Sequence, residues 1–363
     1  MSKKLLVILV LVGFFSFLFL NAYGFLGSVT NYDKSQSLES VKKIKNKVTT
    51  PKFPPLDKIS YDKKLEELAN NPTTPPSAPL LNQGGEGGGN SKPNLWPVKT
   101  VYPNAGALLP FNRIIAYYGN LYSKKMGVLG EYPEDLMLAK LEHEVDKWEE
   151  ADPATPAIPA LHYIAVVAQG SAGGDGKYRF RMPDKEIDKV LTMAEKINGI
   201  VFLDVQVGLS DVPTEIPLLL KYLKLPNVHL GIDPEFSMKT GVRPGKVIGT
   251  LYATDINFAI EYLAEVVKEN NLPPKILVIH RFTQKMVTNY QDIKPLPEVQ
   301  VVMNMDGWGF EAKKINTYKQ TIYPEPVQFT GFKLFYKNDT LTDPAIMTPE
   351  KVLKLRPKPI YIQ

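Results

Sequence analysis

The sequence predicts an α/β protein whose main domain is a (β/α)8 barrel of the TIM type. From residue 111 onward, short runs of β-branched and aromatic residues alternate with amphipathic helical patterns. The runs are almost continuously apolar, which is typical of parallel strands buried on both faces. Eight such runs, most of them followed by a helical pattern, favour a closed barrel. A doubly wound open sheet is the alternative.

The eight predicted strands are short. They span residues 113–119, 161–170, 199–208, 227–236, 246–253, 275–282, 299–309 and 327–336. Helical patterns follow the first, second, third, fifth and eighth strands. The segment after the fourth strand, "SMKTGVRPGK", has no clear helical pattern and makes one unit of the barrel irregular.

The first 27 residues have the pattern of an export signal. Lys3 and Lys4 precede the apolar run "LLVILVLVGFFSFLFL". This run is long for the core of a cleaved signal peptide and short for a transmembrane span, so both a cleaved signal and a retained membrane anchor stay open. In either case the lysines remain inside the cell and the rest of the chain lies outside the cytoplasm. The membrane is a partner only if the segment is retained.

Residues 28–105 are predicted to form a stalk between this segment and the barrel domain at 106–363. The stretch "NPTTPPSAPLLNQGGEGGGNSKP" is rich first in proline and then in glycine, a composition that is typical of spacers. Two short amphipathic helices are expected within the stalk, in "SQSLESVKKIKNKV" and "YDKKLEELANN".

The charge and the missing motifs exclude several functions. The net charge is +5, and the basic surplus lies in the leader and stalk, so nothing in the barrel region indicates nucleic-acid binding. The chain has no cysteine, which excludes disulfides, thiolate metal sites and a cysteine nucleophile. No phosphate-binding loop, serine-hydrolase elbow, zinc-protease motif or dinucleotide fingerprint is present. We therefore expect no cofactor.

Acidic residues near the ends of apolar strands are the most informative candidates. An unpaired carboxylate inside a sheet is costly, so it is either paired or exposed to a water-filled cavity. Active sites of (β/α)8 barrels lie at the carboxyl ends of the strands. The third, fourth and seventh predicted strands bring four carboxylates toward that end, namely Asp204, Asp233, Glu235 and Asp306.

Paired carboxyl groups at a barrel mouth indicate glycoside hydrolysis, in which one carboxyl donates a proton and the other acts as nucleophile or base. We predict Glu235 as the general acid, Asp204 or Asp233 as its partner, and Asp306 as a group that orients a ring hydroxyl. The structural alternative is that Asp233 caps the following turn and Asp306 begins a "DG" turn.

Other side chains near the strand ends are predicted to bind substrate. Aromatic rings supply platforms for sugars, and polar groups supply hydrogen bonds. These candidates are Gln169, Gln206, Tyr117, Tyr118, His280, Arg281 and Trp308. His162 and His229, by contrast, fall at the predicted starts of strands and are expected to be structural.

Seven segments of the barrel region carry a family resemblance. They are "AYYGN", "MGVLGE", "DPEF", "HRF", "MDGWG", "GFKLFY" and "PKPIYIQ". Through them the chain resembles an uncharacterised family of exported bacterial (β/α)8 barrel proteins. More distantly, a strand-start "AYYG" and "FLDV", together with the "DPE" strand end, are similar to glycoside-hydrolase barrels, including lysozyme-like and chitinase-like ones. The fourth strand lacks the chitinase D-x-x-D-x-D-x-E run, so the resemblance implies fold and location more than mechanism.

Taken together, these features predict an exported or surface-tethered hydrolase that acts on a cell-envelope or extracellular polysaccharide. One alternative is a carbohydrate-binding barrel without turnover. Another is a metal-assisted hydrolase that uses Asp204, Asp233, Glu235 and His280 in the same acidic pocket, although no metal-binding spacing signature is present.

Overall fold

The computed structural model describes residues 53–71, 94–342 and 345–363. The chain from Thr50 to Gln363 forms one compact unit. The predicted export segment and the first predicted stalk helix lie outside the described residues. Within the described residues, no helix is long and apolar enough to cross a membrane.

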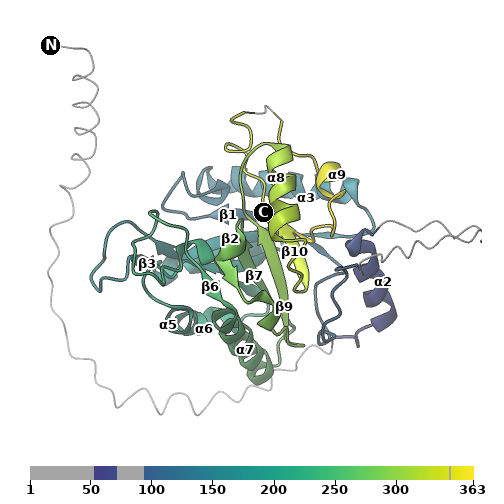
Figure 1. The fold of residues 1–363 in the computed structure, drawn as a ribbon, viewed down its shortest axis with the longest axis horizontal. Coiled ribbons are helices and arrows are strands. Elements are labelled where there is room, and N and C mark those ends of the chain that lie inside the picture. The colour runs from purple at the N-terminus through teal and green to yellow at the C-terminus, as the bar shows by residue number, and fades with distance from the viewer. Residues whose placement is uncertain (1–52, 72–93, 343–344) are drawn as a thin grey trace, which may run out of the picture. The chain divides into compact units, whose positions relative to one another are not determined.

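The unit is built on a closed barrel of eight parallel strands, which confirms the predicted fold class (Figure 1). Each strand pairs with the next, and the last strand pairs with the first, so no barrel edge is left open. The barrel strands are β1 (Arg113–Gly119), β2 (Ala157–Ala168), β4 (Ile200–Val205), β5 (Val228–Ile232), β7 (Lys275–Arg281), β9 (Val299–Met305), β10 (Phe329–Phe332) and β11 (Tyr361–Ile362). A short strand, β3 (Arg179–Arg181), pairs antiparallel with the end of β2.

The pairing corrects one predicted strand and adds one barrel strand that was not predicted. Of the predicted fifth strand only β6 (Leu251–Tyr252) is extended, and it pairs outside the barrel with β8 (Val287–Thr288). No place is left for it in the barrel, because β5 pairs directly with β7. The eighth place belongs instead to β11 at the end of the chain. The irregular unit expected after the fourth strand is therefore a long connection between two neighbouring barrel strands.

The helices lie outside the barrel and connect its strands (Figure 1). They are α3 (Glu134–Ala151), α4 (Asp184–Lys196), α5 (Val212–Glu215), α6 (Leu220–Leu223), α7 (Ala253–Asn270), α8 (Glu311–Thr321) and α9 (Pro349–Val352). The 3₁₀ turns are η2 (Val128–Gly130), η3 (Ile216–Leu219), η4 (Pro234–Phe236), η5 (Gln284–Met286) and η6 (Tyr290–Asp292). The apolar faces of the longer helices and the outer face of the sheet form the larger hydrophobic core.

One further helix, α2 (Lys58–Ala69), packs at the amino-terminal end of the barrel. It begins at Asp57, whose side chain accepts hydrogen bonds from two backbone N–H groups of the first turn. Tyr61 and Leu68 of this helix join the core inside the barrel, with Phe202 and other inward residues of the strands. The predicted stalk helix is thus part of the compact unit, and the predicted domain boundary at residue 106 falls inside that unit.

Candidate active site

A cavity of about 780 Å³ opens at the carboxyl ends of the barrel strands. Three of the four predicted carboxylates line it, namely Asp233, Glu235 and Asp306. Its walls also carry aromatic rings from Tyr117, Tyr118, Phe282, Trp308, Phe335 and Tyr336. Lysines border the same cavity: Lys124, Lys125, Lys313, Lys333 and Lys337. The cavity is therefore a polar, partly aromatic site at the end of the barrel where barrel enzymes carry out catalysis.

Asp233 both caps a turn and contributes to the cavity. It directly follows β5, and its Oδ1 accepts a hydrogen bond of 3.0 Å from the backbone N–H of Glu235 in η4. Its Oδ2 accepts a longer hydrogen bond, 3.4 Å, from Gln206 Nε2. Burial, followed by the negative charges of Asp204, Asp306 and Glu235, raises the pKa of Asp233 to about 8, against the opposing effect of a nearby imidazole.

Glu235 is half-buried in the wall of the cavity, on the turn that Asp233 caps. Burial and the negative charge of Asp306 raise its pKa, and the positive charges of Lys333 and His280 oppose this shift. Among the described residues, no group donates a hydrogen bond to its carboxyl oxygens. Glu235 is thus a carboxyl group inclined to keep its proton, and its oxygens are available to a ligand.

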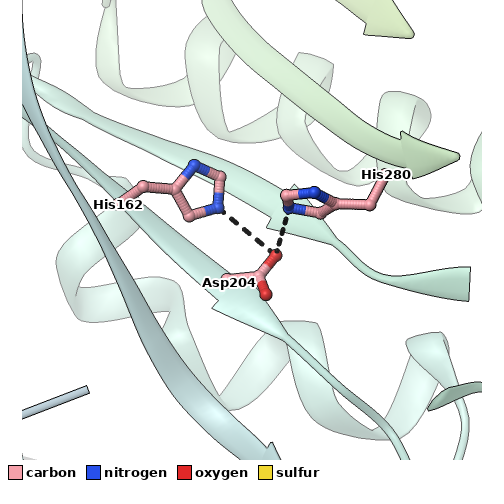
Figure 2. A group of neighbouring side chains, drawn as sticks. All are labelled: His162, Asp204 and His280. Carbon is pink, nitrogen blue, oxygen red and sulfur yellow. Dashed lines mark ion pairs between the residues drawn. The ribbon is translucent and has the colours of Figure 1, made fainter. Parts of the chain in front are cut away.

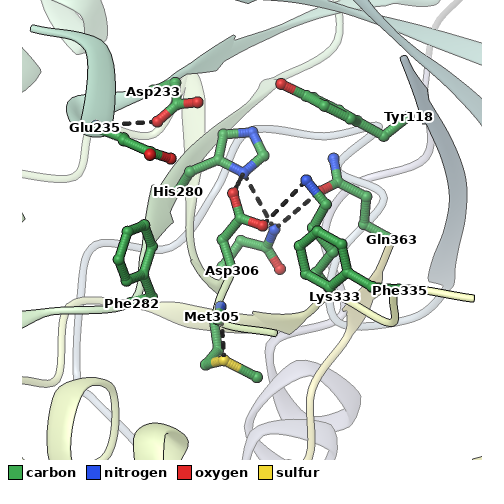
Figure 3. Close-up of polar contacts among 12 residues, drawn as sticks. Tyr118, Asp233, Glu235, His280, Phe282, Met305, Asp306, Lys333, Phe335 and Gln363 are labelled. Atoms are coloured by element: carbon green, nitrogen blue, oxygen red, sulfur yellow. Dashed lines mark hydrogen bonds and ion pairs between the residues drawn. The ribbon is translucent and has the colours of Figure 1, made fainter. Parts of the chain in front are cut away.

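Asp306 has the opposite electrostatic environment. Its Oδ1 lies 3.0 Å from Lys333 Nζ, and its Oδ2 lies 3.1 Å from His280 Nδ1 (Figure 3). Burial alone would raise the pKa of Asp306, but Lys333 and His280 outweigh it and lower the pKa. The Lys333 ammonium also lies 3.8 Å from the centre of the Tyr118 ring. Asp306 is therefore held as a carboxylate at the cavity.

The fourth predicted carboxylate, Asp204, lies in the barrel interior and does not line the cavity. Its Oδ1 is 3.3 Å from His162 Nε2 and 3.4 Å from His280 Nε2 (Figure 2). The Tyr118 hydroxyl donates a hydrogen bond of 3.2 Å to Oδ2, and Tyr118 itself lines the cavity. Burial opposes ionisation of Asp204, but the two imidazoles outweigh it and lower the pKa.

The same groups shift the imidazole pKa values in opposite directions. Burial alone would lower the pKa of His280, but the carboxylates of Asp204 and Asp306 outweigh it and raise the pKa to about 10. For His162, burial dominates the effect of Asp204 and lowers the pKa to about 4. The negative charge of Asp204 is therefore compensated mainly by the positive charge of His280 and less by His162.

The predicted substrate-binding residues divide into two groups. Tyr117, Tyr118, Gln206 and Trp308 line the cavity, whereas His280 is buried outside the lining and contacts Asp306 from there. Arg281 does not reach the cavity, because it follows His280 on β7 and so points to the opposite face of the sheet. Its guanidinium pairs with Glu325 and donates to backbone carbonyls of the next loop. Gln169 also does not line the cavity.

Sequence reasoning missed three polar residues of this region. Lys333 directly follows β10, within the apolar run "GFKLFY", and Gln363 directly follows β11. Both therefore lie at the carboxyl end of a barrel strand, where site residues are expected, and both line the cavity. His162 was placed at the start of a strand, whereas β2 begins at Ala157 and His162 lies in its middle. The lysine within a predicted apolar strand could have identified Lys333 as a site residue. A strand of two residues such as β11 has no recognisable pattern, so Gln363 could not be identified in this way.

Comparisons with known proteins identify no family for the chain. No family model and no curated protein matches it. Among solved structures, a mannanase of Bacillus subtilis is similar with a TM-score of 0.32 and 12% identity, over 70% of this chain and 88% of that chain. A ruminal GH26 endo-β-1,4-mannanase is similar with a TM-score of 0.33 and 10% identity, over 69% of this chain and 58% of that chain. Likenesses this slight do not bear on activity, and the barrel itself is established by its strand pairing.

Proposed function

We propose that the protein is a glycoside hydrolase in which Glu235 donates the proton and Asp306 is the opposing carboxylate. The observation that carries this proposal is the presence, in one cavity, of two carboxyl groups in opposite electrostatic environments. One is shifted toward its protonated form and the other is held ionised by a lysine. Hydrolysis of a glycosidic bond requires an acid and a base of this kind.

The proposed reaction uses the two groups in sequence. Glu235 gives its proton to the glycosidic oxygen as the bond from that oxygen to the anomeric carbon breaks. Asp306 acts at the anomeric carbon, either as the base that takes a proton from the attacking water or as the nucleophile. In the second case water, deprotonated by Glu235, then hydrolyses the ester between the sugar and Asp306. Asp233 lies beside Glu235 and caps the turn that carries it. Asp204 does not contact the sugar, because it lies in the barrel interior outside the cavity lining.

The walls of the cavity support a sugar polymer as the substrate. Trp308 is 50% exposed, and its ring carries the Lys313 ammonium at 4.6 Å from the ring centre. Flat, exposed rings next to hydrogen-bonding groups are suitable platforms for sugar rings. We propose, from the leader sequence, that the protein acts outside the cytoplasm on a cell-envelope or extracellular polysaccharide, tethered to the membrane if the leader is retained.

The test is a Glu235→Gln variant assayed for new reducing ends on peptidoglycan, mannan, xylan and alginate. We expect kcat/KM on the cleaved glycan to fall by ~10²–10⁴-fold, because the amide cannot donate the proton. Binding of the same glycan, measured by affinity electrophoresis, should persist. In the wild type, kcat/KM should fall as the pH rises through the raised pKa of Glu235, because the acid form is then lost.

The matched control is Glu261→Gln, which changes an exposed glutamate on α7. It should leave turnover unchanged. Equal turnover in the wild type and Glu235→Gln would refute the role of Glu235 as the acid. A wild-type protein that binds one of these glycans but releases no reducing ends would instead establish a carbohydrate-binding barrel.

A further inference from the structure

Three metal-ligating atoms face one another inside the barrel, outside the cavity lining. They are Nε2 of His162 on β2, Oδ1 of Asp204 on β4 and Nε2 of His280 on β7, and all lie within 4.8 Å of one another (Figure 2). All three side chains are completely buried. They come from three different strands, so the barrel itself brings them together.

None of these three atoms has a hydrogen-bond partner among the described residues. Asp204 Oδ1 lies 3.3 Å and 3.4 Å from the two imidazole nitrogens, within ion-pair distance but without a hydrogen bond. A buried polar atom without a hydrogen-bond partner costs about 1–3 kcal/mol, and an ion bound by all three atoms would remove this cost. Ligand atoms at about 2.0–2.1 Å from a tetrahedral ion are about 3.3–3.4 Å apart, which matches both separations.

The remaining polar atoms of the same side chains are held by neighbours. His162 Nδ1 lies 2.6 Å from the Tyr361 hydroxyl, and His280 Nδ1 lies 3.1 Å from Asp306 Oδ2. Asp204 Oδ2 accepts a hydrogen bond from the Tyr118 hydroxyl. Outer contacts of this kind orient metal-ligating imidazoles and carboxylates and fix their tautomers. Each side chain is therefore held at one polar atom and presents the other toward the shared space.

Gly231 on β5 leaves that space open. It pairs with Asp204 across the sheet, and a Cβ atom at this position would lie 2.4 Å from His162 Nε2 and 2.5 Å from Asp204 Oδ1. Any side chain here would therefore enter the group of ligand atoms. Glycine at this position is explained by the close approach of the His162 and Asp204 side chains to the backbone of β5, and it leaves the space between them free.

We propose that His162, Asp204 and His280 bind one divalent transition-metal ion in the barrel interior, zinc or an ion of similar preference. Two imidazoles and one carboxylate suit such ions better than calcium or magnesium, which prefer oxygen ligands alone. The ion ties β2, β4 and β7 together and, through His280, positions Asp306 at the cavity floor. The proposal does not rest on the proposed glycosidase activity, because metal content is measured without turnover.

The test is the metal content of the full-length chain, produced in medium supplemented with zinc or with cobalt so that the ion is present while the buried site forms. After washing with a chelator, we expect about one ion per chain by mass spectrometry of the metals. The cobalt form should show the strong visible bands of a tetrahedral Co²⁺ site. X-ray absorption at the zinc edge should show two imidazole ligands.

Two variants and one control decide where the ion binds. His162→Gln removes a ligand, and Gly231→Ala fills the space without removing one, so both should lower the metal content at least about tenfold. His143→Gln, which changes an exposed histidine on α3, should retain it. A wild-type chain without metal, or equal metal in His162→Gln and the wild type, would overturn the proposal. If the variants do not fold, the ligand count from X-ray absorption of the wild type still decides it.

Discussion

Asp233 combines two roles that the sequence offered as alternatives. Its Oδ1 caps η4 by accepting the Glu235 N–H, which is the structural role, and the residue also lines the cavity. The cap orients the turn that carries Glu235, so the structural role serves the site. A short turn with a proline between the two carboxyl groups is what places both of them at the cavity.

We expect Asp233→Asn to make the protein less sensitive to rising pH. Burial and the carboxylates of Asp204, Asp306 and Glu235 raise the pKa of Asp233 to about 8, although His280 opposes the shift. The folded state therefore keeps a proton that the unfolded state loses near its ordinary pKa of about 4. The resulting stability is complete below about pH 4 and is lost as the pH rises through about 8, by at most about 1.4 kcal/mol per pH unit.

The measurement is urea unfolding of the wild type and Asp233→Asn at about pH 5 and about pH 8. The wild type should lose more free energy of unfolding between the two pH values than the variant does. Asp146→Asn, which changes an exposed aspartate on α3, is the control and should follow the wild type. Parallel losses in the wild type and Asp233→Asn would contradict the prediction.

Helix α2 closes the amino-terminal end of the barrel, opposite the cavity. Its backbone and side chains are tied to the last part of the chain, since Lys358 N–H donates to Leu68 O at 2.7 Å and Asn70 Nδ2 donates to Leu355 O at 2.9 Å. The Tyr61 ring packs edge-on against Tyr102 and Phe111. Half of the residues of this helix are charged, so its pattern predicted a helix but not the surface that it covers.

We expect Tyr61→Ala to lower the free energy of unfolding by about 3–5 kcal/mol, because it leaves a cavity beneath the barrel. Tyr61→Phe keeps the ring and should lose less than about 1.5 kcal/mol. Ile59 is on the same helix and is 84% exposed, so Ile59→Ala should change stability by no more than about 0.5 kcal/mol. Guanidinium unfolding of the full-length chain measures all three. Similar losses in Tyr61→Ala and Ile59→Ala would show that α2 does not seal the barrel.

Closure of the barrel depends on a two-residue strand at the end of the chain. β11 pairs with both β1 and β10, and Ile360 contributes a hydrogen bond to each neighbour. Tyr361 contacts His162 in the interior, and Gln363 lines the cavity. A closed barrel leaves no strand edge exposed, so this short segment protects two edges at once.

We expect deletion of Tyr361, Ile362 and Gln363 to abolish the cooperative unfolding transition, because β1 and β10 then both expose unpaired edges. Thermal unfolding followed by circular dichroism measures this. Gln363→Ala keeps the strand and removes only a side chain at the cavity, so it should retain a cooperative transition. A truncated chain that melts cooperatively at the wild-type temperature would contradict the importance of β11.

The local patterns of the sequence determined most of the architecture and part of the site. Apolar runs separated by helical patterns are local features. They were enough to predict a barrel, seven of its eight strands and the end of the barrel where Asp233, Glu235 and Asp306 meet. The predicted fifth strand, residues 246–253, does not belong to the barrel, and β11 was missed because two residues carry too little pattern to predict a strand.

The tertiary structure decided the depth and the partners of each polar side chain. Asp204 pairs in register with Gly231, two residues before Asp233, and so lies one layer below the cavity. His162 and His280 meet Asp204 from strands far away in the sequence, and Lys333 reaches Asp306 in the same way. Register between distant strands sets these heights, and no local pattern contains it. Most of the strands and the acidic residues at their ends can therefore be predicted from the sequence. The closure of the barrel determines which carboxylates face a substrate and which are buried among imidazoles.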